Sequence, residues 1–107
     1  MRKLLAFAAA AAFCVQALAA GDPASGKQKS QVCAACHGAD GNTPTGPEFP
    51  RLAGQHYDYL LKALRDYKSG ARKDPVMGAQ AAALTAQDMA DLAAYFSDQK
   101  GSLHVIR

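Results

Sequence analysis

The chain has 107 residues, of which 50% are hydrophobic, with 12 basic side chains, 9 acidic side chains and three cysteines. This length accommodates one ordinary domain, and the hydrophobic content is too high for a disordered protein. The charge is also too sparse for a nucleic-acid-binding tail, so we expect no nucleic-acid partner.

Residues 1–19 are predicted to be a secretory signal peptide that is cleaved off. Arg2 and Lys3 form a basic start, and an apolar run of 12 residues follows. Ala17 and Ala19 then place small residues at the two positions that an export peptidase recognises. Because a membrane-spanning helix needs about 20 apolar residues, the run is too short for a permanent anchor. We therefore expect a periplasmic protein.

Cleavage would leave a mature domain, residues 20–107, with a formal charge of only +1. Many of its apolar residues are alanines, which fill little volume. A domain of this size buries only about 60–65% of the surface of its unfolded chain and is marginally stable alone. Cys33 and Cys36 are too close in sequence to link distant segments by a disulfide. Something else is therefore expected to help fill the core.

The mature domain begins with a predicted helix. Asp22 and Pro23 match an N-cap and first helical position, and the helix runs toward Cys33. Gly26 inside it costs about 1 kcal/mol of helix stability relative to alanine, so we expect it to permit a close contact. From residue 38 to residue 54, Gly, Pro, Asn and Asp occur at the density of a loop.

A second helix is predicted from Gln55 to Ser69, ending at Gly70. One face of this helix is apolar and carries Tyr57, Leu60, Leu61, Leu64 and Tyr67. The opposite face carries Lys62, Arg65 and Lys68. Neighbouring aspartates dilute this charge, so we interpret the basic face as solvated surface rather than a docking patch.

The last helix is predicted from Thr85 to Ser97, after a loop around Met77 and a single helical turn at residues 79–83. Thr85 and Asp88 resemble the paired residues of a capping box. The helix carries an apolar stripe of Met89, Leu92, Ala93 and Phe96. The sequence thus predicts an all-α fold with three or four helices.

The most specific feature is the segment Cys33-Ala-Ala-Cys36-His37, the C-x-x-C-H pattern of c-type haem attachment. Two thiols three positions apart on a helical turn project to one side, where each can add to a haem vinyl group. His37 then follows in position to ligate the iron. A haem would also supply the missing core volume.

Three other interpretations compete with haem. A thioredoxin-like redox pair needs a neighbouring βαβ unit, but Val, Ile and Thr are sparse and never alternate here. A structural zinc site needs four ligands, and the chain has no second cysteine pair. A simple disulfide would leave the adjacent histidine unexplained.

The second axial ligand has four candidates, Met77, Met89, His56 and His104. Met89 belongs to the apolar stripe of the last helix, so we expect it in the core. His56 opens a helix and His104 follows in the C-terminal tail, so both are expected to be solvent-exposed. Met77 lies in the loop-like segment and joins no apolar stripe. We therefore favour Met77 as the ligand.

These features resemble the class I c-type cytochromes, in particular small exported bacterial members related to one half of a dihaem cytochrome. The resemblance covers nearly all of residues 21–101. It rests, in order, on Gly26, Cys33-Ala-Ala-Cys36-His37-Gly38, Pro50-Arg-Leu-Ala-Gly54-Gln55, Asp74-Pro-Val-Met77 and Leu92-Ala-Ala-Tyr95-Phe96. The resemblance implies one low-spin haem c, attached through Cys33 and Cys36 and ligated by His37 and Met77.

The resemblance further implies that the Pro50 carbonyl accepts a hydrogen bond from Nδ1 of His37. It also implies that the first helix packs across the last, so that Gly26 admits the Tyr95 or Leu92 side chain. One departure is the polar pair Lys29 and Ser30, near which an apolar residue would be expected.

Two strong-field ligands leave no open position on the iron, which favours one-electron transfer over enzymatic chemistry. We expect a monomeric, soluble periplasmic carrier that moves electrons from quinol-oxidising complexes or dehydrogenases to oxidases or reductases. Its contacts with redox partners are expected to be transient. The alternative is a haem enzyme or ligand sensor with a labile sixth position.

Overall fold

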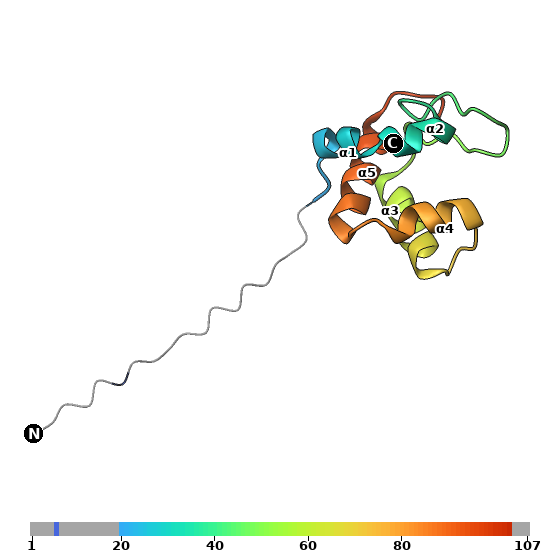
Figure 1. Ribbon diagram of the computed structural model, residues 1–107. Coiled ribbons are helices and arrows are strands. Elements are labelled where there is room, and N and C mark those ends of the chain that lie inside the picture. Colours follow the sequence, from blue (N-terminus) through green and yellow to red (C-terminus); the bar gives the residue numbers. More distant parts are fainter. Residues whose placement is uncertain (1–5, 7–19, 104–107) are drawn as a thin grey trace, which may run out of the picture.

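The computed structural model describes residue 6 and residues 20–103. Most of the expected signal peptide, and His104, lie outside the described residues. Within them the chain forms helices and no strands, which confirms the all-α prediction. The helices, shown in Figure 1, are α1 (Pro23–Lys29), α2 (Gln31–His37), α3 (Tyr57–Ser69), α4 (Pro75–Ala82) and α5 (Ala86–Asp98). None of them is long and apolar enough to cross a bilayer.

The predicted N-terminal helix divides into α1 and α2 at Ser30. Asp22 caps α1 as expected, with its side chain accepting a hydrogen bond from the Ala24 amide at 3.1 Å. At the other end, the Ser30 hydroxyl donates to the Lys27 carbonyl at 2.7 Å. Serine hydroxyls that bond to nearby backbone compete with regular helix formation. This local bond accompanies the break in the helix.

The glycine at position 26 lets α1 lie directly on α5, where the two helices cross (Figure 1). A Cβ atom added at Gly26 would lie 2.0 Å from the Asp91 carbonyl oxygen and 2.7 Å from Cβ of Tyr95. The expected contact of Gly26 with Tyr95 is therefore confirmed. The Tyr95 hydroxyl also donates to the Ala39 carbonyl at 3.1 Å, which ties α5 to the loop after α2.

The apolar stripe of α5 forms the centre of the core. Met89, Leu92, Ala93 and Phe96 are all at most 5% exposed, as predicted. Leu60 of α3 packs with this stripe. Around it lie partly buried apolar side chains, namely Cys33, Leu52, Tyr57, Leu61, Leu64 and Leu84. The start of α5 is the predicted capping box, in which Thr85 and Asp88 bond to each other's backbone amides.

The prediction of a loop around Met77 is wrong, because α4 begins before it. Asp74 is the N-cap of α4 and Pro75 occupies the first helical position. This is the same pattern that starts α1 at Asp22 and Pro23, so the sequence contained the signal for the helix. The single turn expected at residues 79–83 is the second half of α4.

The basic face of α3 is exposed, as predicted. Lys62 pairs with Asp66 on the same helix, and Nζ of Lys68 donates to the carbonyl of Leu84 just beyond α4. The helix ends at Gly70, whose φ of +83° is a left-handed conformation that glycine adopts without strain. The hydrogen bond from Lys68 to the Leu84 carbonyl connects α3 to the end of α4.

Candidate functional site

The short helix α2 carries both thiols of the C-x-x-C-H motif. Cys33 and Cys36 are free and partly buried. Because residues three apart on a helix are neighbours, the two thiols share one side of α2. They are therefore placed to form two bonds to a single flat group.

His37 is the last residue of α2 and is only 5% exposed. Its Nδ1 atom lies 2.8 Å from the carbonyl oxygen of Pro50, the acceptor that the family resemblance implied. A carbonyl oxygen only accepts, so the proton resides on Nδ1 and the lone pair on Nε2. The Phe49 ring packs edge-on to the imidazole at a centroid distance of 6.2 Å. The ring is thereby fixed with Nε2 available to bind iron.

The long loop after α2 folds back and brings Pro50 to His37. The Gly38 backbone leaves the helix with φ of +88°, a conformation that favours glycine. The Thr45 amide then donates to the Cys36 carbonyl at 2.9 Å, and the Leu52 amide donates to the Gly41 carbonyl at 2.9 Å. These bonds explain how a residue 13 positions away orients the imidazole.

The environment of the Cys33 thiol raises its pKa. Burial raises the pKa of the Cys33 thiol, and the neighbouring Cys36 adds to the increase. Reactive cysteines in thiol oxidoreductases instead have lowered pKa values. The described residues also contain no strand and no cluster of three or more His, Cys, Asp or Glu side chains that could hold a metal ion.

The four candidates for the second axial ligand lie in different environments. Met89 is 5% exposed and belongs to the core, as expected. His56 is exposed at the start of α3, also as expected, and His104 lies outside the described residues. Met77 is partly buried in the first turn of α4. Among the described candidates, Met77 is thus the one that is partly buried, whereas Met89 is fully buried and His56 is exposed.

Covalent haem c requires two thiols for attachment and an imidazole to bind its iron. Cys33, Cys36 and the oriented ring of His37 provide these groups, so the residues present fit haem c. The model of the family described as "Cytochrome c" matches residues 23–100, from the first residue of α1 to beyond α5. The chain belongs to the cytochrome c family. Membership implies covalently bound haem c with its iron.

The cytochrome is also similar to individual proteins. Cytochrome c4 of Pseudomonas aeruginosa is 54% identical over 85 residues, which cover 79% of this chain and 42% of that protein. Cytochrome c-554(548) of Halomonas halodenitrificans is 42% identical over 84 residues, which cover 76% of this chain and 100% of that protein. The cytochrome thus spans less than half of one relative and the full length of another.

The fold of the cytochrome agrees with these similarities. The crystal structure of reduced cytochrome c4 from Pseudomonas stutzeri superimposes with a TM-score of 0.72 and 49% sequence identity. The superposition covers 78% of this chain and 48% of that chain. The all-helical architecture is therefore that of the cytochrome c family.

Proposed function

We propose that this cytochrome is a one-electron carrier of the periplasm. Its haem c is attached through Cys33 and Cys36, and its iron is ligated by His37 and Met77. The observation that carries this proposal is the hydrogen bond from His37 Nδ1 to the Pro50 carbonyl, because it leaves Nε2 as the coordinating atom.

The haem and the residues around it have separate roles. Haem c supplies a reversible one-electron couple when bound. The Pro50 carbonyl holds the imidazole of His37 in one orientation and increases its basicity. Met77 contributes a soft thioether that favours the ferrous state and raises the reduction potential. With His37 and Met77 both holding the iron, no position would remain for a substrate.

Export and partner binding follow from the same proposal. Residues 1–19 act as a cleaved signal peptide, and residues 20–107 form the cytochrome domain. Electron carriers exchange partners quickly, so we expect a monomer that makes small, transient contacts with redox proteins. Mass spectrometry of the periplasmic protein should find a chain that starts at Ala20 and carries one haem. An uncleaved chain would contradict the export step.

The axial ligation is tested by comparing Met77→Ala with Met89→Ala in the purified ferrous protein. Only Met77→Ala is expected to bind carbon monoxide, because only this variant opens a position on the iron. Met89→Ala is the matched control, since it truncates a methionine of the core. Carbon monoxide binding by Met89→Ala alone would contradict the assignment of Met77. Binding by the native protein would indicate a labile sixth position, as in a ligand sensor.

A further inference from the structure

The backbone of Met77 is bonded directly to the side chain of Asp74. Oδ1 of Asp74 accepts hydrogen bonds from the amides of Val76 and Met77, each at 2.9 Å. Pro75, which lies between Asp74 and Val76, has no amide hydrogen to donate. One carboxylate oxygen therefore satisfies two of the amides that the first turn of α4 leaves without helical acceptors.

Two further constraints on α4 act beyond Met77. Ala81 is fully buried, and Lys68 of α3 holds the Leu84 carbonyl after the helix has ended. Helices as short as the 8 residues of α4 are unstable alone, and Gly78 lowers the helix propensity further. The turn that carries Met77 thus depends on its N-cap for its conformation.

Asp74 acts by accepting hydrogen bonds rather than by its charge. No ion pair involves Asp74 among the residues that the structure describes. The nearby Arg72 guanidinium instead lies over the Tyr67 ring, 4.7 Å from its centroid. A neutral side chain that keeps the acceptor should therefore preserve the function of Asp74.

We propose that Asp74 is a positioning residue for the axial ligand. By fixing the first turn of α4, Asp74 sets the direction in which the Met77 side chain leaves the backbone. Loss of the cap loosens this turn and weakens the bond from the thioether to the iron. This inference rests on the proposed ligation by Met77.

The test compares three variants of the ferric holoprotein, Asp74→Ala, Asp74→Asn and Asp58→Ala. Asn keeps an N-cap acceptor but removes the charge. Asp58 is the control, because it is an exposed aspartate in the first turn of α3 whose carboxylate accepts no hydrogen bond from the residues that the structure describes. The measurements are the affinity for imidazole, which competes with the methionine, and the methionine-to-iron charge-transfer absorbance.

We expect Asp74→Ala to bind imidazole about fivefold more tightly than the native protein, the effect of losing a typical N-cap. Its charge-transfer band should also weaken. Asp74→Asn and Asp58→Ala should remain within about twofold of the native protein.

If Asp74→Ala bound imidazole with the same affinity as the native protein, the positioning role would be overturned while ligation by Met77 would stand. An Asn variant as impaired as the Ala variant would also overturn it. Absence of the band from the native protein would overturn the ligation and this inference together. If Asp74→Ala fails to fold, the comparison of Asp74→Asn with Asp58→Ala still decides whether Asp74 acts through its hydrogen-bond acceptor or through its charge.

Discussion

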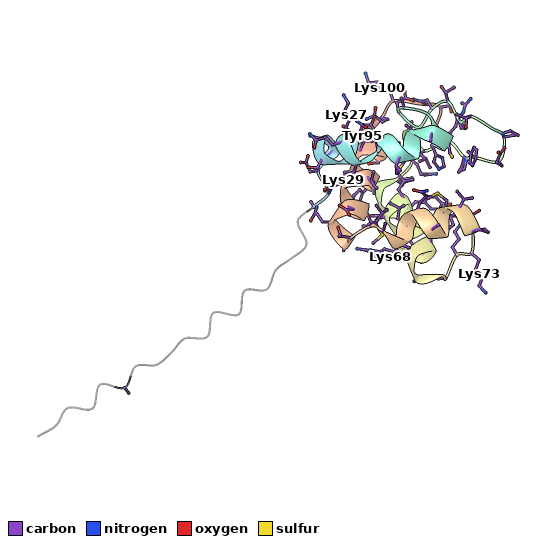
Figure 2. All side chains as sticks on the ribbon, viewed as in Figure 1. Lys27, Lys29, Lys68, Lys73, Tyr95 and Lys100 are labelled. Atoms are coloured by element: carbon purple, nitrogen blue, oxygen red, sulfur yellow. The ribbon has the colours of Figure 1, made fainter. Side chains whose placement is uncertain are left out.

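Nζ of Lys29 in α1 lies 2.6 Å from Oδ2 of Asp91, a residue of α5 that is 3% exposed. The place of Lys29 on α1 can be followed in Figure 2. Lys29 also lies 2.9 Å from Oδ1 of Asp88. The other carboxylate oxygen of Asp91 accepts hydrogen bonds from the Asp22 amide at 2.9 Å and from Gln87 at 2.8 Å. Lys29 thus completes a partly buried network between α1 and α5.

Replacing Lys29 with Met should lower the melting temperature of the holoprotein. The variant keeps the length of the side chain but leaves the buried Asp91 without its charged donor. Lys27→Met is the matched control, because Lys27 lies on the same helix with an exposed side chain that forms no ion pair within the described part of the chain. Equal melting temperatures for the two variants, measured by circular dichroism, would contradict a stabilising role for the network.

Asp91 should make the stability depend on pH in the acid range. Burial alone would raise the pKa of Asp91, but the bonds from Lys29, the Asp22 amide and Gln87 outweigh it, so the pKa is lowered. A carboxyl group with a lowered pKa stabilises the fold above its unfolded value of about 3.9. This contribution is lost as the pH falls through the lower, folded value.

The variant Asp91→Asn tests this dependence. At pH 7 we expect its free energy of unfolding to be about 1–3 kcal/mol below that of the native protein. In urea titrations the difference should shrink below about pH 4, as the native carboxyl becomes protonated. A difference that stays constant down to pH 2 would show that the Asp91 charge does not contribute.

Gly26→Ala should lower the free energy of unfolding by about 1–3 kcal/mol, although alanine normally favours a helix. The new Cβ would lie 2.0 Å from the Asp91 carbonyl oxygen, so α1 and α5 must separate. Gln28→Ala serves as control at an exposed site of the same helix. A stability gain in Gly26→Ala by urea unfolding would contradict the close crossing.

Thr85→Ala should destabilise the protein by about 1 kcal/mol through loss of the α5 capping box. The Thr85 hydroxyl accepts from the Asp88 amide at 3.1 Å, and this amide would lose its partner. Thr85→Ser keeps the hydroxyl and should retain native stability in the same thermal unfolding measurement. Similar losses in both variants would assign the effect to the lost methyl group instead.

Much of the site could be predicted from residues that are close in sequence. The spacing of Cys33, Cys36 and His37 defines the attachment chemistry, because these side chains lie within one helical turn of each other. Helix ends at Asp22, Gly70 and Thr85 were also predicted, since caps depend on hydrogen bonds between residues two to four positions apart. The start of α4 at Asp74 was missed although it carries the same kind of signal.

The sequence by itself determined the helical class, the haem motif and the apolar stripe of α5, all of which follow from spacings within one helix. Only the tertiary structure decided that Lys29 meets Asp91, 62 residues further along the chain. Contacts between distant segments depend on how helices cross and loops close, and these arrangements emerge only when the whole core is packed.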